Sequence, residues 1–201
     1  MAKFGAIGCV AILVLAAILG VVVAGTYNNL NTLDQGVRAQ WAQVENVYQR
    51  RADLVPNLVE TVKGAAGFEK DTYTQVAEAR SKVGQISGDA MKNVLNDPQA
   101  FERYQQAQSG LSSALSRLMA VAEAYPDLKA NANFRELQSQ LEGSENRITV
   151  ERKRFNETAQ AFNTKRTSFP TTIIASFFPR FAEKPYFKAA EGSDKAPQVK
   201  F

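Results

Sequence analysis

The chain has 201 residues, a formal net charge of +4, one cysteine and no histidine. Without histidine it lacks the commonest general base and the commonest metal ligand of proteins, and a single cysteine cannot form an intramolecular disulfide. The positive excess lies in residues 164–201, with seven basic and three acidic side chains, a mild charge that favours an anionic surface over nucleic acid. We therefore expect no catalytic residue, no bound cofactor or metal ion and no nucleic-acid partner.

An uncharged apolar run begins after a short flank, residues 1–3. It covers residues 4–25 and is long enough to cross about 30 Å of hydrocarbon as a helix, so we predict a transmembrane helix over residues 4–26. The alternative is a cleaved signal peptide, but the run exceeds the usual apolar region of a signal. Lys3 on one side of the run, against Arg38 on the other, favours a soluble domain outside the cytoplasm.

A broad apolar stripe then runs through residues 30–65. Its main column, with a period of seven residues, has apolar side chains at Leu30, Val37, Val44 and Leu58 and an arginine at position 51. Neighbouring apolar columns widen this stripe to the face of a bundle helix. Pro56 removes one backbone hydrogen bond of this helix. We expect a kink near Ala52 rather than a break, because the stripe keeps its phase across the proline.

Three further helices are predicted after the first. The second covers residues 68–87, and the third opens at Asp97, which acts as a cap before a first-turn proline. The fourth is expected to start with Asn133 and Glu136 as a capping box. Short loops between long helices imply antiparallel neighbours. The predicted fold class is all-α, an N-terminal transmembrane helix followed by an elongated antiparallel four-helix bundle over residues 27–168.

One charged residue, Arg51, interrupts the apolar stripe of the first helix, and a buried charge needs a partner. At 1.5 Å per residue, Arg51, Arg80 and Glu145 fall at about the same height, roughly 20 Å from the end of the bundle far from the membrane. Gln108 lies close to this level on the third helix. We predict a buried polar layer in which both arginines donate to Glu145. The layer either fixes helix register or forms a binding site.

The segment at residues 169–190 is too rich in proline for a long helix and too apolar for a solvated linker. Because the helices alternate in direction, we expect this tail beside the bilayer, docked to anionic lipid. The alternative is packing on the base of the bundle or against a neighbouring subunit. The tail residues assigned to membrane contact are Phe177, Phe178, Arg180, Phe181, Lys184, Tyr186 and Phe187. Residues 191–201 are expected to form a disordered polar end.

Several segments between Tyr27 and Phe187 resemble one protein family. They are YQRRADLVPNLV at residues 48–59, Val62, Lys63, Gly64, Glu69, Ala79, Arg80, Tyr125, Pro126, Leu128, Lys129, Phe134, Leu137, Glu145, Ile148, Arg152, Asn156, Asn163, Phe169 and Pro170. This pattern resembles the LemA family of bacterial envelope proteins. The resemblance implies a membrane anchor followed by an elongated antiparallel helical bundle, no enzyme activity, and a membrane protease as a candidate partner. The polar end at residues 191–201 departs from the family pattern.

Three asparagines that match this pattern are Asn57, Asn156 and Asn163. We interpret them as amides that bond across the bundle, with ligand contact as the alternative.

No phosphate-binding glycine loop, serine nucleophile motif or cysteine pair occurs in the chain. Together with the resemblance, which implies the bacterial cell envelope, this absence of motifs predicts a non-enzymatic, membrane-anchored scaffold or adaptor that acts through protein contacts or self-assembly. It is expected in the inner membrane with one pass and a periplasmic bundle. Expected partners are the lipid bilayer, an envelope protein such as a membrane protease, and a second copy of the chain. The alternative function is a lipid-binding or membrane-remodelling module that uses the basic aromatic tail.

Overall fold

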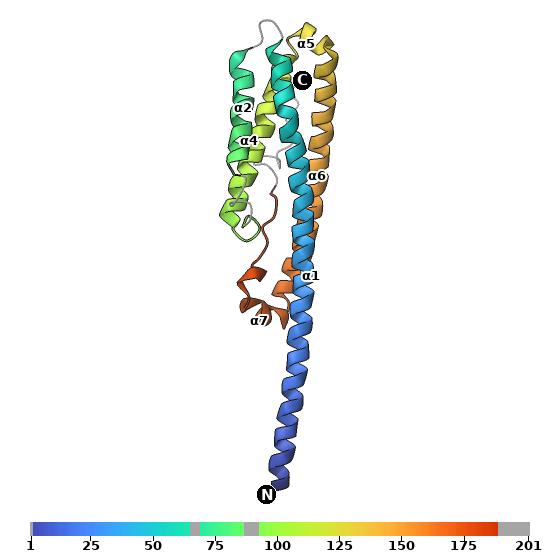
Figure 1. The fold of residues 1–201 in the computed structure, drawn as a ribbon, viewed down its shortest axis with the longest axis vertical. Helices are drawn as coiled ribbons and strands as arrows, with labels where there is room; N and C mark the ends of the chain where they lie inside the picture. The colour runs from blue at the N-terminus through green and yellow to red at the C-terminus, as the bar shows by residue number, and fades with distance from the viewer. Residues whose placement is uncertain (1, 65–68, 87–92, 189–201) are drawn as a thin grey trace, which may run out of the picture.

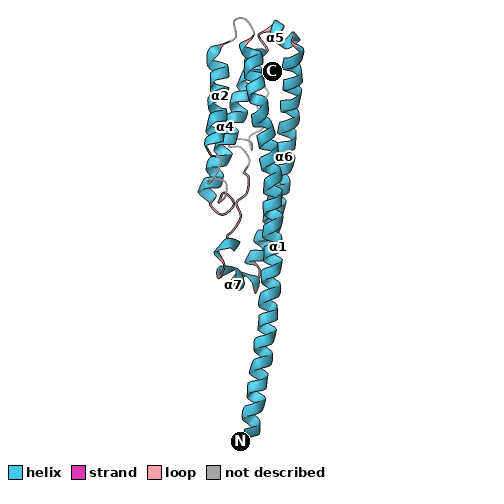
Figure 2. Cartoon of the chain, viewed as in Figure 1, coloured by secondary structure: helices cyan, strands magenta, loops and turns pink. Residues whose placement is uncertain are grey.

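The structure, a computed structural model, describes residues 2–64, 69–86 and 93–188, with side chains from residue 12 onward. All regular structure in these ranges is helical, which confirms the predicted all-α class (Figures 1 and 2). The elements are α1 (Ala2–Lys63), α2 (Lys70–Gln85), α4 (Pro98–Ala122), α5 (Pro126–Ala130), α6 (Ala132–Thr167), α7 (Thr171–Ser176) and the 3-10 helix η1 (Pro179–Phe181). Residues 65–68, where the first predicted helix gives way to the second, and the whole polar end at residues 191–201 lie outside the described residues.

The first helix, α1, has 62 residues and is about 93 Å long at 1.5 Å per residue. Its side chains at residues 12–25 are exposed and mostly apolar, and Leu30 is the first buried one. Among the described residues, this is the helix that is long and apolar enough to cross a membrane. Figure 1 shows it projecting alone beyond the bundle. The predicted transmembrane segment and the first bundle helix therefore form one continuous element.

The bundle is built from α1, α2, α4 and α6, which run alternately in opposite directions (Figure 1). We call the end near the projecting segment proximal and the other end distal. α1 packs mainly along α6, and α2 packs mainly along α4. Because α2 has 16 residues against 25 in α4 and 36 in α6, it covers only the distal half of the bundle.

Each half of the bundle has its own hydrophobic core. The distal core is mainly aliphatic and contains Val55, Leu58, Val59, Val62, Val76, Val83, Leu111, Leu115, Leu118, Ala122, Leu128, Phe134 and Leu141. The proximal core is rich in aromatic rings and contains Leu30, Val37, Trp41, Val44, Tyr48, Val94, Leu95, Phe101, Tyr104, Ile148, Phe155, Ala159, Phe162, Ala175, Phe181 and Phe187. Trp41 is central to it, because its ring lies 5.4–6.0 Å from the rings of Phe101, Tyr104, Phe155 and Phe187.

After α6 the chain turns back into the proximal half. α7 and η1 form the turn, and residues 182–188 then run extended toward the distal end (Figure 1). We call residues 182–188 the return segment. Phe187 of this segment and Phe181 just before it are buried in the proximal core. In the proximal half, the return segment thus fills the position that α2 fills in the distal half. The bundle consists of four helices in its distal half and of three helices with one extended segment in its proximal half.

Helix starts follow the capping residues of the sequence with one correction. Asp97 caps α4 as predicted, because its side chain accepts hydrogen bonds from two N–H groups of the first turn. α6 begins before the predicted capping box, since Asn131 is the cap and accepts from the N–H groups of Asn133 and Phe134. Asn133 already lies inside the first turn, so its own N–H is one of the groups being capped.

Candidate functional site

A polar layer separates the distal core from the proximal core. Its centre is Arg51 of α1, which is 1% exposed. Arg51 Nη1 donates to Ser112 Oγ (2.6 Å) and to Glu145 Oε1 (2.5 Å). Arg51 Nη2 donates to the side chain (2.5 Å) and the backbone carbonyl (3.3 Å) of Gln108. The structure therefore brings Arg51, Gln108 and Glu145 together, at one level of the bundle.

Most hydrogen-bond partners of the polar layer belong to the chain itself. The Arg51 guanidinium also lies 5.2 Å from the centre of the Tyr48 ring, a cation–π distance. Glu145, by contrast, is 45% exposed, so water reaches its carboxylate. Both terminal nitrogens of Arg51 donate to groups inside the bundle, whereas its buried Nε has no hydrogen-bond partner among the described residues. The contacts at the terminal nitrogens are those expected of a polar layer that fixes helix register.

Arg80 lies outside this layer, contrary to the prediction that it donates to Glu145. Its Nε donates to the backbone carbonyl of Ala52 at 3.0 Å. In a helix that carbonyl would accept from residue 56, but Pro56 has no N–H. Arg80 therefore supplies the hydrogen bond that Pro56 removes, and α1 continues as a helix through this position. The kink expected near Ala52 stays a prediction.

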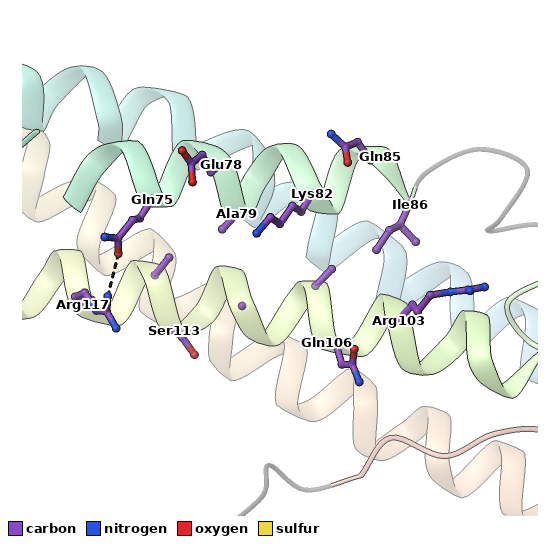
Figure 3. Close-up of a pocket in the computed structure, with 13 residues that line it drawn as sticks. Gln75, Glu78, Ala79, Lys82, Gln85, Ile86, Arg103, Gln106, Ser113 and Arg117 are labelled. Atoms are coloured by element: carbon purple, nitrogen blue, oxygen red, sulfur yellow. Dashed lines mark hydrogen bonds between the residues drawn. The ribbon is translucent and has the colours of Figure 1, made fainter. Parts of the chain in front are cut away.

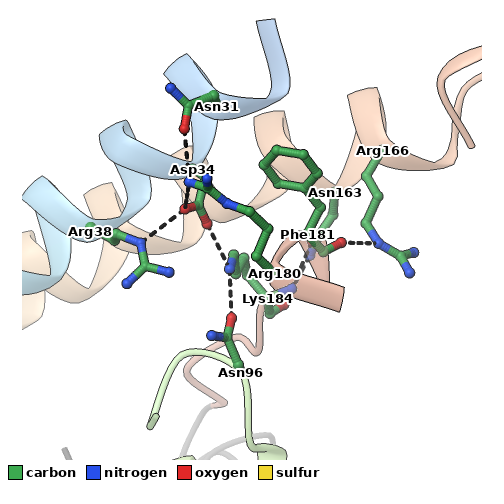
Figure 4. Close-up of polar contacts among 9 residues, drawn as sticks. All are labelled: Asn31, Asp34, Arg38, Asn96, Asn163, Arg166, Arg180, Phe181 and Lys184. Atoms are coloured by element: carbon green, nitrogen blue, oxygen red, sulfur yellow. Dashed lines mark hydrogen bonds and ion pairs between the residues drawn. The ribbon is translucent and has the colours of Figure 1, made fainter. Parts of the chain in front are cut away.

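A second buried polar site, which the sequence analysis missed, lies in the proximal half (Figure 4). Asp34 of α1 and Lys184 of the return segment are both buried, and Lys184 Nζ lies 2.7 Å from Asp34 Oδ1. Lys184 also donates to the side chain of Asn96 at 2.8 Å. The other carboxylate oxygen of Asp34 lies 2.9 Å from Arg38 Nε and 3.8 Å from Arg180 Nη2. One carboxylate thus faces three cations, and we call this group the Asp34 cluster.

The Asp34 cluster shifts the pKa values of its two buried members. Burial acts to raise the pKa of Asp34, but hydrogen bonds and charges from Lys184 and Arg38 outweigh it and hold the pKa below its usual value. Burial lowers the pKa of Lys184, and the nearby cations Arg38 and Arg180 act in the same direction against the attraction of Asp34. Asp34 is therefore a firmly ionised anion at neutral pH.

Three side-chain amides hold the backbone of the return segment. Asn163 of α6 donates to the carbonyl of Lys184 and accepts from its N–H, both at 2.9 Å. Asn156 makes the same pair of bonds with Phe187, both at 2.9 Å. Gln105 of α4 makes a longer pair with the following residue, at 3.3 and 3.5 Å. We call these contacts the amide clamps. Two of the asparagines noted in the sequence, Asn156 and Asn163, therefore form hydrogen bonds with the backbone of the same chain.

The spacing of the amide clamps matches a helix to an extended chain. Asn156 and Asn163 are seven residues apart, about 10.5 Å along a helix axis. Their partners, Phe187 and Lys184, are three residues apart, about 10 Å along an extended chain. One face of α6 therefore offers a donor and an acceptor at two heights that match residues three apart in an extended chain.

The structure divides the aromatic tail into buried and exposed parts, which corrects its assignment to membrane contact. Phe181, Lys184 and Phe187 are buried inside the bundle, because they fill the proximal space that α2 leaves open. The other members with contacts inside the chain are Phe178 (ring 5.0 Å from that of Tyr27), Arg180 (bonded to Tyr27 and Asn31) and Tyr186 (accepting from Asn163). Phe177 remains largely exposed.

A shallow groove of about 670 Å³ runs between α2 and α4 (Figure 3). The small side chains that line it are Ala79, Ala107, Gly110, Ser113 and Ala114, and its three alanines pack against the distal core. The charged residues of the lining are Glu78, Lys82, Arg103 and Arg117. At one end Arg117 donates to Gln75 at 2.9 Å, which joins the two helices. The groove is therefore open, lined in part by small residues and net positive.

The part of the chain that the structure describes contains no cluster of three or more His, Cys, Asp or Glu side chains arranged to hold a metal ion. The polar layer, the Asp34 cluster and the groove offer charge pairing, hydrogen bonding and apolar contact.

A long apolar N-terminal helix that continues into an antiparallel bundle defines a membrane-associated helical protein. Comparison with known families gives the particular class. The model of the LemA family matches residues 40–201, and the chain belongs to this family.

Among similar proteins, magnetosome protein MamQ 1 of Paramagnetospirillum magneticum is 26% identical over 84% of this chain and 66% of its own length. Magnetosome protein MamQ of Magnetospirillum gryphiswaldense is 28% identical over 79% of this chain and 65% of its own length. Protein LemA of Metamycoplasma hominis is 23% identical over 77% of this chain and 65% of its own length. The chain thus spans about two thirds of the length of the curated relatives that it matches.

Proposed function

We propose that this protein is a membrane-anchored scaffold of the bacterial envelope, whose groove between α2 and α4 binds an acidic helix of another envelope protein. The observation that carries this proposal is the groove itself. Small side chains in its lining permit the close approach of a second helix. Three basic residues against one acidic residue in the lining favour an acidic partner, through complementary charge.

The proposed partner is tested by photo-crosslinking in native membranes, with a photoreactive amino acid at Ser113 of the full-length chain. We expect a crosslink to another protein that has an acidic helical segment. Gly110→Trp should reduce this crosslink about tenfold or more by filling the groove. A Cβ atom at Gly110 would meet no atom within 4 Å, so a side chain can start there without a clash, and the bundle should still fold. Gly143→Trp, at an equally open glycine on α6, is the matched control and should leave the crosslink unchanged.

A crosslink to a second copy of the chain would mean that the groove serves self-assembly and not an acidic partner, and so would contradict the proposal. A crosslink to lipid alone, or one that survives Gly110→Trp, would also contradict it. Reversal of charge at Lys82 and Arg103 to glutamate should weaken the expected crosslink, because it turns the attraction for an acidic helix into repulsion.

We also propose that α1 crosses the inner membrane once and that the bundle lies on the periplasmic side. The exposed apolar surface of α1 at residues 12–25 supports a span. Protease added to spheroplasts should then digest the bundle. Full protection until the membrane is permeabilised would place the bundle in the cytoplasm instead.

A further inference from the structure

Exposed apolar side chains gather around α7, at the proximal end of the bundle. Phe169, Ile173 and Phe177 follow one another at four-residue spacing and are 80%, 52% and 75% exposed. We call these three residues the apolar tip. Among the described side chains outside the projecting part of α1, the other large exposed apolar residues are Val150 and Tyr186, each by itself. Single exposed apolar residues are ordinary on a protein surface, but three of them within nine residues are unusual.

The apolar tip does not arise from a loose segment. The side chains of α7 that face the bundle, namely Thr171, Ile174 and Ala175, are buried. Ala175 belongs to the proximal core. α7 thus has apolar residues on its bundle side and on its outer side, an arrangement typical of a helix that lies between protein and a second apolar medium.

The position of α7 identifies that medium. The apolar run of α1 ends at Gly25, and Tyr27 lies two residues further along the chain. The Tyr27 ring lies 5.0 Å from the Phe178 ring and 5.4 Å from the Phe181 ring, and its hydroxyl accepts from Arg180 at 3.2 Å. These contacts hold the end of α7 at the level where the apolar run of α1 ends. Figure 1 shows α7 beside α1 at the end of the bundle from which α1 projects.

We infer that the apolar tip inserts into the interfacial layer of the bilayer that α1 enters, and gives the bundle a second attachment to the membrane. Aromatic side chains favour this layer, in which one side is apolar and the other wet. Lys165 and Arg180 flank α7 in the chain and are exposed, so they can pair with anionic headgroups. Two attachment points fix the tilt of the bundle, whereas α1 alone leaves it free to tilt. This inference is independent of the groove between α2 and α4.

The test measures the depth of single spin labels on the full-length chain in a Cys9→Ala background, reconstituted into vesicles of phosphatidylethanolamine and phosphatidylglycerol. Labels are placed at Phe177→Cys, at Ile18→Cys in the apolar run, and at Val150→Cys. Val150 is the matched control, because it is an exposed apolar residue midway along α6. Collisions with oxygen report the lipid phase, and collisions with a water-soluble nickel complex report the aqueous phase.

We expect the label at residue 177 to favour oxygen and to lie about 5–10 Å into the boundary between headgroups and acyl chains. The label at residue 18 should lie deeper, and the label at residue 150 should favour the nickel complex. The inference would be overturned if the label at residue 177 collided with the nickel complex as often as the label at residue 150 does. Protection of residue 177 from both reagents would also overturn it, since the cover would then be protein.

Discussion

The two halves of the bundle close their fourth side in different ways. The distal half uses the helix α2, and the proximal half uses the extended return segment at residues 182–188. A helix satisfies its own backbone hydrogen bonds, so α2 needs little more than an apolar face to dock. An extended segment brings unpaired N–H and C=O groups, which must find partners when buried. The amide clamps supply those partners for the extended chain, and the Asp34 cluster adds a buried ion pair to the side chain of Lys184 in the same segment.

This difference predicts that single polar substitutions will act mainly on the proximal half. The largest effect is expected for Asp34→Ala, which leaves Lys184 buried without its anion. The cost should be about 3–5 kcal/mol of unfolding free energy, measured by denaturant titration of the full chain in micelles. Hydrogen exchange should localise the loss to the return segment. Arg38→Ala removes a partly exposed partner and should cost only about 0.2–1 kcal/mol. Equal losses in the two variants would contradict this assignment.

Arg51→Met tests the boundary between the halves. It should cost about 2–3 kcal/mol, because the buried amide of Gln108 loses its charged partner. In a Gln108→Leu background the same substitution should cost less by about 1 kcal/mol, since no buried polar group is then left unpaired. The measurement is a double-mutant cycle by urea unfolding. Strict additivity would show that the two side chains do not stabilise each other.

Asn156→Ala removes one amide clamp. Two hydrogen bonds to Phe187 are lost, so we expect a cost of about 1–2 kcal/mol and faster hydrogen exchange at the Phe187 N–H. Exchange in the distal half should not change. Asn146→Ala, at an exposed asparagine of the same helix, is the control and should stay within about 0.5 kcal/mol of the parent.

Acid should destabilise the proximal half by less than Asp34→Ala does, because a protonated Asp34 still accepts hydrogen bonds. The folded pKa of Asp34 lies below its ordinary value of 3.8. The stabilisation is therefore complete above that value and is lost as the pH falls through the folded pKa. Exchange of the return segment, expressed relative to the intrinsic rate at each pH and followed from neutral pH downward, should rise below about pH 4. Asp34→Asn should remove this rise, and an unchanged profile in that variant would assign it to another group.

The smallest effect is expected for Arg80→Ala in the distal half, where it removes one exposed hydrogen bond to Ala52. We predict a cost of about 0.5 kcal/mol. In a Pro56→Ala background the cost should vanish, because residue 56 then donates to the same carbonyl. A cost that persists in that background would mean that Arg80 acts by other contacts.

The helical part of the fold could be predicted from the sequence, since the apolar stripe and caps such as Asp97 are local signals. The rise per residue placed Arg51 and Glu145 at one height, and they are in contact. Height does not fix the direction in which a side chain points around its helix, so Arg80 was assigned to the wrong acceptor. The better signal was Pro56, which leaves the carbonyl four residues earlier without a partner.

The return segment could not be predicted, because its course depends on contacts between residues far apart in the chain and it has no helical period. Asp34 did carry a signal that the sequence analysis overlooked. It lies four residues after Leu30 and three before Val37, so it falls on the apolar face of α1. The seven-residue spacing of Asn156 and Asn163 is the other trace of this site in the sequence.

The unbroken course of α1 also determines where a partner can be met. A flexible tether would let the bundle explore a wide volume above the membrane, whereas a continuous helix together with the proposed attachment at the apolar tip would hold the groove at a nearly constant distance from the bilayer. If the proposed partner is anchored in the same membrane with its acidic helix at that distance, it would meet the groove at a high effective concentration. A freely diffusing protein would gain no such advantage, so the proposed binding would select anchored neighbours by height as well as by charge.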